Sequence, residues 1–260
     1  MTEPVVTFTK SDAVGVITLN RPPANSYDIH FMRDLDAAIE AANGDAGVKA
    51  VILKSASEKF FSAGADVKAF MANATTGNME MIRFAHQALD KMAASAKVFI
   101  AAINGHALGG GLEMALACDL RFAAEGSYRV GLPEITLGLL PGNGGTQRLP
   151  RLIGANKALE MMITGEAVAP SDALRLGIVN RLFPADKLME ETEAYARKLA
   201  SGASVAVGRI KQAVYRGIAR PLSDGLALER ELIEPLFDTE DAKEGFAAFA
   251  EKRPPTYKGK

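Results

Sequence analysis

Two glutamates in this sequence stand where a carboxyl group could move protons. Glu113 follows the run Gly109-Gly110-Gly111-Leu112, and Glu134 stands between Pro133 and apolar residues. The apolar setting predicts that Glu134 is desolvated and that its pKa is raised, which makes a carboxyl a useful proton donor near neutral pH. Each residue also has a plainer interpretation: Glu113 could cap a helix, and Glu134 could be an ordinary surface glutamate.

Two loops of small residues could expose backbone N–H groups to a substrate. The triple glycine opens a predicted helix directly after a strand that ends at Ile103, and a helix N-terminus favours a developing negative charge. In residues 60–66, glycine and alanine leave the backbone uncovered, although a tight turn without function would look the same. Neither loop matches a phosphate-binding P-loop or a dinucleotide fingerprint. Residues 143–146 predict a helix start, with Arg148 in a structural ion pair.

Other catalytic chemistries find little support in the sequence. The single cysteine, Cys118, lies in an apolar stretch and is predicted to be a buried structural thiol. The histidines His30, His86 and His106 lack metal-ligand spacing, so the sequence predicts neither a metal site nor a resident cofactor.

Composition limits the partners that we expect. A formal net charge of −1 supplies no global field for nucleic acid or anionic lipid. The chain is 48% hydrophobic, yet no uninterrupted apolar run approaches the roughly 20 residues of a membrane helix. Residues 1–10 mix polar and charged residues with apolar ones, unlike a signal or transit peptide. We therefore expect a soluble, cytoplasmic protein.

The elements that must position the two glutamates alternate between strand and helix. This alternation predicts an α/β fold, and the recurring order of strand, loop and helix suggests repeated units stacked on one another. A chain of 260 residues fits one such domain with an appendage. We expect strands at residues 5–9, 14–19, 50–53 and 98–103, and helices at residues 29–42, 79–94 and from about 110.

The C-terminal quarter has a different pattern. Amphipathic helices are expected there, at residues 186–200, 204–219, 222–236 and 238–252. Pro221 and Pro235 bound the third of them, because proline removes a backbone donor. No flexible linker precedes this part, so we expect it to pack on the core or on a neighbouring subunit. We divide the chain into a core, residues 1–200, and a helical subdomain, residues 201–260.

Taken together, the loops resemble those of the crotonase superfamily, and more narrowly those of enoyl-CoA hydratase. The likeness covers almost the whole chain, in residues 17–22, 62–66, 104–113, 131–134, 141–149 and 251–253. It implies a spiral of repeated β-β-α units followed by a C-terminal helical subdomain. It also implies the addition of water to a 2-enoyl-CoA, as in the beta-oxidation of fatty acids.

The resemblance assigns roles to four catalytic positions. The backbone N–H groups of Ala65 and Gly110 would hold the thioester oxygen. Glu113 and Glu134 would hold the attacking water between them, with Glu113 deprotonating it for attack at C3 and Glu134 supplying the proton to C2. The division of proton transfer stays open here, because two close carboxyls titrate as a coupled pair.

Coenzyme A enters this scheme as part of the substrate. The residues implied for its adenine and phosphate end are Ala24, Asp66, Val67 and Lys68, with Lys68 as a phosphate partner. Phe249 and Lys252 match a family segment that reaches the CoA of a neighbouring subunit, although Lys252 could equally be a solvated lysine on an amphipathic helix. Family members usually form hexamers as a dimer of trimers, so the resemblance implies a homo-oligomer, either a trimer or a dimer of trimers.

One segment departs from the hydratase pattern. Residues 22–28, Pro-Pro-Ala-Asn-Ser-Tyr-Asp, lack the Ala-Leu-Asn-Ala-Leu wording of many hydratases and look more like isomerase relatives. The nearest alternative is therefore a shift of a 3-enoyl double bond to position 2, which needs the same oxyanion site and one acid. An RNA-binding protein on the same fold is a further alternative, against which the near-neutral charge argues.

Overall fold

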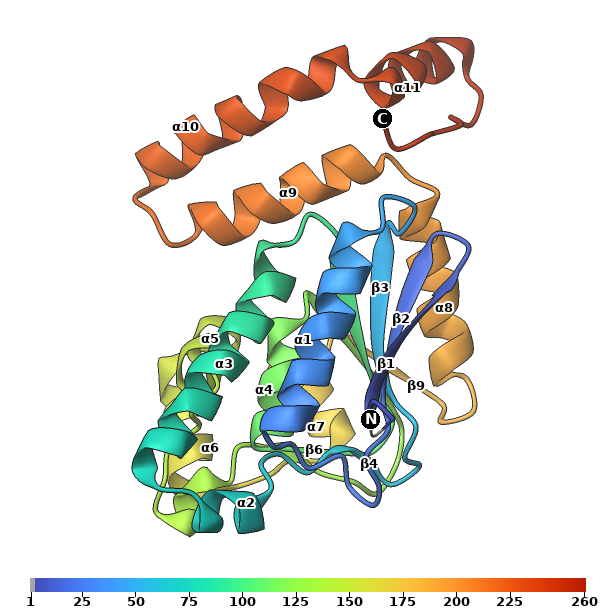
Figure 1. The fold of residues 1–260 in the computed structure, drawn as a ribbon. Helices are drawn as coiled ribbons and strands as arrows, with labels where there is room; N and C mark the ends of the chain where they lie inside the picture. The colour runs from blue at the N-terminus through green and yellow to red at the C-terminus, as the bar shows by residue number, and fades with distance from the viewer. Residues whose placement is uncertain (1–2) are drawn as a thin grey trace.

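The computed structural model describes residues 3–260 as two β-sheets surrounded by helices (Figure 1). The strands are β1 (Val6–Ser11), β2 (Val14–Leu19), β3 (Ala50–Ser55), β4 (Phe60–Ser62), β5 (Val98–Ile103), β6 (His106–Leu108), β7 (Leu120–Ala124), β8 (Val130–Gly131) and β9 (Arg181–Phe183). The helices are α1 (Ile29–Gly44), α2 (Val67–Ala72), α3 (Thr75–Ala94), α4 (Gly110–Ala117), α5 (Gly145–Ile153), α6 (Ala155–Thr164), α7 (Pro170–Leu176), α8 (Leu188–Ala200), α9 (Ser204–Gly217), α10 (Leu222–Ile233) and α11 (Glu240–Glu251), with short 3-10 segments η1 (Glu134–Leu137) and η2 (Glu234–Asp238).

The two sheets are built from a repeated unit. The larger sheet has the order β1-β2-β3-β5-β7-β9, and the smaller has the order β4-β6-β8. All pairs are parallel except β1 with β2. Each unit sends its first strand to the larger sheet and its second to the smaller one, and a helical segment follows, as in β3-β4-α2, β5-β6-α4 and β7-β8-η1. The expected repetition of strand, loop and helix is confirmed.

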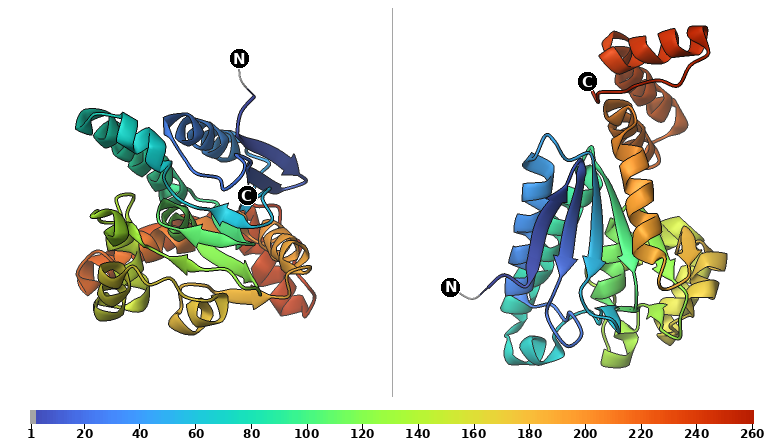
Figure 2. Two further views of the ribbon diagram at one scale, coloured as in Figure 1. Left: turned by 90° about the horizontal axis from the view of Figure 1, so that it is seen from below. Right: turned by 90° about the vertical axis from the view of Figure 1, so that its right-hand side faces the viewer.

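The apolar strands of the sequence occupy the middle of the larger sheet. Every residue of β5 is buried, and so are the first four residues of β3. Such continuous burial is typical of parallel strands that are covered on both faces. Helices α1 and α8 cover opposite faces of this sheet (Figure 2). No helix within residues 3–260 is long and apolar enough to cross a membrane.

The last three helices form a separate layer. Helices α9, α10 and α11 lie together beyond one end of the larger sheet, whereas α2 lies at the opposite end of the molecule (Figure 1). The helices expected in this quarter are confirmed with small shifts at their ends. The preceding helix, α8, packs on β2, β3, β5 and β7. The division of the chain after residue 200 stays a prediction.

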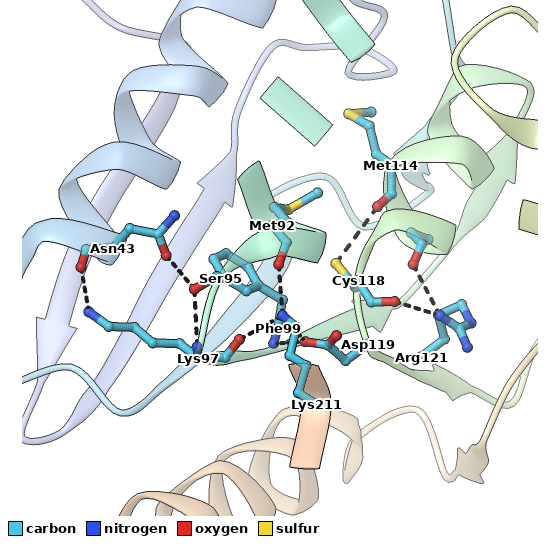
Figure 3. Close-up of polar contacts among 11 residues, drawn as sticks. Asn43, Met92, Ser95, Lys97, Phe99, Met114, Cys118, Asp119, Arg121 and Lys211 are labelled. Carbon is cyan, nitrogen blue, oxygen red and sulfur yellow. Dashed lines mark hydrogen bonds and ion pairs between the residues drawn. The ribbon is translucent and has the colours of Figure 1, made fainter. Parts of the chain in front are cut away.

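A buried lysine fastens α9 to the core (Figure 3). The Nζ atom of Lys211 donates to the carbonyl oxygens of Met92 and Lys97 at 2.7 and 2.9 Å, and to Asp119 Oδ2 at 2.9 Å. It also lies 5.5 Å from the centroid of the Phe99 ring. Burial lowers the pKa of Lys211 and raises the pKa of Asp119, so each charge depends on the other.

The same region holds the single cysteine. Cys118 is buried, and its thiol donates to the carbonyl oxygen of Met114 with a sulfur–oxygen distance of 3.7 Å (Figure 3). Burial raises the pKa of the Cys118 thiol to about 12, so it stays protonated and unreactive at neutral pH. The prediction of a buried structural thiol is confirmed.

Lys211→Met should lower the free energy of unfolding by about 3–5 kcal/mol, because it leaves the Asp119 carboxylate buried without its charge partner. The measurement is chemical unfolding followed by circular dichroism. Lys157→Met, which removes an exposed pair with Glu160, is the matched control and should leave stability nearly unchanged. A loss no larger than that of the control would contradict the anchoring role.

Candidate active site

Three loops meet at the carboxyl ends of the strands of the smaller sheet. Strand β4 leads into residues 63–66, β6 leads into Gly109 and helix α4, and β8 leads into η1. Because β4, β6 and β8 are parallel neighbours, their carboxyl ends lie at one edge, where ligands of parallel sheets commonly bind. The sheet therefore brings the two small-residue loops and both glutamates to one place.

Two unpaired backbone N–H groups belong to the first two loops. Gly64 has a φ of +88°, and a Cβ atom there would lie 2.8 Å from the carbonyl oxygen of Leu108 and 3.1 Å from the nitrogen of Gly110. Glycine is thus required for the two loops to approach this closely. Neither the Ala65 N–H nor the Gly110 N–H has a hydrogen-bond partner within residues 3–260. Gly110 is buried and Ala65 is half-buried, and backbone N–H groups in such positions are normally paired, so both are available to an oxygen of a ligand.

Glu113 is almost fully buried, at 1% exposure. Its Oε1 atom accepts hydrogen bonds from the backbone N–H groups of Asn143 and Gly145, both at 2.7 Å. The carboxylate is thus held by the loop before α5 and does not cap its own helix. Burial raises the pKa of Glu113, while these N–H groups and the charge of Arg148 oppose the rise.

Glu134 lies at the start of η1 and faces the start of α4. A Cβ atom on Gly109 would lie 2.9 Å from Glu134 Oε1, and the Oε2 atom is buried without a hydrogen-bond partner within residues 3–260. Burial first, and then the charge of Glu113, raises the pKa of Glu134 to about 7. The expected desolvation is confirmed, and the interpretation as an ordinary surface glutamate is wrong. A carboxyl in this state can donate a proton at neutral pH.

A cavity of about 510 Å³ opens beside the loop that follows β4. Its walls include four residues that the resemblance assigned to coenzyme A, namely Ala24, Asp66, Val67 and Lys68, together with Ala65. The Asp66 side chain caps α2 by accepting from the N–H groups of Lys68 and Ala69 at 3.1 and 3.3 Å. It also pairs with Arg21 at 3.3 Å, so the Asp66 carboxylate shapes this wall.

Two of the predicted CoA residues are not brought to this cavity. Phe249 lies on α11 and is 88% exposed. Lys252 ends the same helix in a left-handed conformation, with a φ of +55°. Figure 1 places α11 at the end of the molecule opposite to α2. Within one chain these side chains do not serve the site, and their contact with a neighbouring subunit's CoA stays a prediction.

Sequence reasoning missed the network that surrounds Glu113. Asn143 and Gly145 were assigned only to the start of α5, which is confirmed, but their N–H groups also hold the Glu113 carboxylate. Tyr27 was noticed only as part of a departure from the hydratase pattern. The structure bonds its hydroxyl to Asn143 Nδ2 at 2.5 Å. These contacts join loops that are distant in sequence. The one sequence signal for them was the departure of residues 22–28 from the hydratase pattern.

Two further side chains support the loop that holds Glu113. His86 Nε2 lies 2.6 Å from the carbonyl oxygen of Gly142, and Arg148 Nη1 donates to the carbonyl oxygen of Asn143 at 2.9 Å. Arg148 also pairs with Asp90 at 2.9 Å, so its predicted structural ion pair is confirmed. No three His, Cys, Asp or Glu side chains in the described part of the chain gather as a metal site would require. Catalysis without a metal stays a prediction.

Lys68→Ala should raise KM for an acyl-CoA ester by about threefold or more with little change in kcat, because a remote phosphate contact acts about equally in the ground and transition states. The exposed position of Lys68 at the cavity permits this contact. Initial-rate kinetics at low salt measure the effect. Lys54→Ala, which removes a charge outside this cavity wall, is the matched control. An unchanged KM for Lys68→Ala would count against the contact.

Solved structures place this fold in the crotonase class. The enoyl-CoA hydratase of Geobacillus kaustophilus is 46% identical, with a TM-score of 0.97 over 100% of this chain and 98% of that one. The enoyl-CoA hydratase of Bacillus anthracis is 39% identical, with a TM-score of 0.94 over 98% of this chain and 100% of that one. The crotonase-type spiral of β-β-α units is therefore confirmed.

The family follows from sequence comparison. The profile described as enoyl-CoA hydratase/isomerase matches residues 9–260, and the chain belongs to that family. A probable enoyl-CoA hydratase of Rhizobium meliloti is 43% identical over 94% of both chains. A short-chain-enoyl-CoA hydratase of Clostridium acetobutylicum is 39% identical over 95% of both.

Proposed function

We propose that this protein adds water reversibly to a trans-2-enoyl-CoA and so forms a 3-hydroxyacyl-CoA. The observation that carries the proposal is the meeting of two N–H groups, unpaired within residues 3–260, with the buried Glu113 and the half-buried Glu134 at one edge of the smaller sheet. The N–H groups of Ala65 and Gly110 bind the thioester oxygen and stabilise the negative charge that gathers there during addition. The names of the relatives support an enoyl-CoA as substrate.

The two glutamates direct the hydroxyl group of water to C3 and a proton to C2. Glu113, as the carboxylate, accepts one proton from the water, whose oxygen forms the bond to C3. Glu134, whose pKa is raised to about 7, supplies a proton to C2. The electron pair of the double bond passes through the thioester enolate and then forms the C2–H bond. Proton exchange between the carboxyls and solvent resets the site.

A 3,2-enoyl-CoA isomerase is the second candidate, because residues 22–28 resemble those of isomerase relatives. Incubation with a short trans-2-enoyl-CoA tests the main proposal through the loss of absorbance of the conjugated thioester. Product analysis with a 3-enoyl-CoA then separates the two reactions, since an isomerase forms the 2-enoyl ester without hydrating it. The net charge of −1 argues against RNA binding. If neither assay detects a reaction, RNA binding becomes the alternative to test.

We further propose a cytoplasmic homo-oligomer, a trimer or a dimer of trimers, that serves beta-oxidation. Large apolar side chains are exposed on the three C-terminal helices or directly after one of them, among them Ile210, Ile218, Leu222, Phe246 and Phe249. Exposed apolar surface of this kind marks a protein interface, and copies of the same chain would cover it. Light scattering on a sizing column tests this, since a monomeric mass would contradict it.

A further inference from the structure

Tyr27 places a buried hydroxyl group at the centre of the site. Its backbone is paired with the oxyanion loop, because its N–H donates to the Gly64 carbonyl at 2.9 Å and its own carbonyl accepts from the Asp66 N–H at 2.8 Å. Tyr27 is 3% exposed. A Cβ atom built on Gly110 would overlap the Tyr27 hydroxyl and ring, so the phenol lies directly against the second oxyanion residue.

The hydroxyl has one fixed partner and one free proton. Asn143 Nδ2 donates to the Tyr27 oxygen at 2.5 Å, and Tyr27 donates to no acceptor within residues 3–260. Burial raises the pKa of Tyr27, and the charges of Glu113 and then Glu134 raise it further. The phenol therefore stays protonated through catalysis: its oxygen accepts from Asn143, its proton is left to donate to a ligand, and it does not act as a base.

Two side chains of the candidate site each carry a buried oxygen atom that has no hydrogen-bond partner in the described part of the chain. These are Asn143 Oδ1 and Glu134 Oε2. Native proteins leave few such atoms unpaired, and a water molecule needs about 2–4 polar partners. A donor from Tyr27 and acceptors from the amide and the carboxyls form the set that a water requires. The Asn143 backbone N–H also holds Glu113, so one residue positions both the phenol and the proposed base.

On the basis of the proposed hydration, we propose that Tyr27 is a further catalytic residue whose hydroxyl, oriented by Asn143, donates a hydrogen bond to the oxygen that enters at C3. The proton of the phenol is not transferred. The hydrogen bond holds the water for attack, and in the reverse direction it stabilises the oxygen that leaves C3. Tyr27 belongs to the segment that departs from the hydratase pattern, so this departure would supply a polar group to the site.

Tyr27→Phe tests the role, because it removes only the hydroxyl. We expect kcat for 2-enoyl-CoA to fall by about 10-fold or more, while KM changes by less than about threefold, since the contact is made to the reacting water. Affinity for a saturated acyl-CoA, which has the thioester but no oxygen at C3, should be unchanged. Asn143→Ala keeps the backbone N–H that holds Glu113, and its effect on kcat should be less than additive with that of Tyr27→Phe.

Tyr128→Phe is the matched control. Tyr128 is also buried, and its hydroxyl contacts the carbonyl oxygens of Ala124 and Ile103 at 2.6 and 3.1 Å, away from the site. This variant should lower Tm and leave kcat near the wild-type value. It shows what the loss of a buried phenol hydroxyl does when the hydroxyl is only structural.

Two results would overturn the role of Tyr27 while the proposed function stands. In the first, the wild type hydrates 2-enoyl-CoA, and Tyr27→Phe lowers kcat by less than about threefold. The other is a loss of saturated acyl-CoA affinity equal to the loss of kcat/KM, which would place the hydroxyl on the thioester oxygen. A folded wild type that hydrates no 2-enoyl-CoA would remove the proposed function, and this role with it.

Discussion

Glu113→Gln and Glu134→Gln should each lower kcat for hydration of a 2-enoyl-CoA by at least about 100-fold, in keeping with the size of general acid-base catalysis. Glutamine keeps the shape of each side chain but can neither accept nor supply the proton. KM should change little, because neither carboxyl carries the main contacts to coenzyme A. Steady-state kinetics with purified variants measure both quantities.

The double variant and the pH profile sharpen this prediction. If both carboxyls serve one addition step, the fold decrease in kcat of the double variant should be much smaller than the product of the fold decreases of the two single variants. With a pKa raised to about 7, Glu134 loses its transferable proton as pH rises, so kcat/KM for hydration should fall above neutral pH. In Glu134→Gln this alkaline fall should disappear, because an amide does not titrate in that range.

An isomerase would give a different pattern. One glutamate would then matter greatly for a 3-enoyl-CoA and the other hardly at all. Glu160→Gln, an exposed glutamate paired with Lys157 on α6, is the matched control and should have wild-type kinetics. If both single variants at Glu113 and Glu134 hydrate a 2-enoyl-CoA at close to the wild-type rate, the hydratase proposal is wrong.

Ala65→Pro should abolish measurable turnover, because proline deletes the one backbone donor that Ala65 contributes to the thioester oxygen. One such donor in a water-excluded site stabilises the transition state by about 3–4 kcal/mol, which corresponds to several hundredfold in kcat. No hydrogen bond of the fold is lost with this N–H, since it has no partner within residues 3–260.

Ala65→Gly is the matched control, because it keeps the N–H group and should retain most of the activity. Binding of free CoA, which has no thioester, reports whether Ala65→Pro still forms the cavity. A variant that binds CoA normally yet does not turn over supports the assignment. Near-normal turnover in a folded Ala65→Pro protein would remove Ala65 from the oxyanion site.

The sequence by itself indicated the long elements of the fold and the two glutamates of the candidate site. Apolar strands such as β5 and amphipathic helices such as α9 produce local hydrophobic patterns in the sequence. They could therefore be predicted with small errors at their ends. The setting of Glu134 between Pro133 and apolar residues predicted a raised pKa, and burial raises the pKa of Glu134 to about 7.

Only the tertiary structure decided which distant groups meet these residues. Tyr27 and Asn143 are 116 residues apart, and their contact depends on how the segment between β2 and α1 packs against the loop before α5. The same holds for the N–H groups that fix Glu113 and for the position of α11, which carries Phe249, at the end of the molecule opposite to α2 (Figure 1). Local propensity says nothing of such contacts, because the pairing of separate strands, and not the pattern within one segment, brings them together.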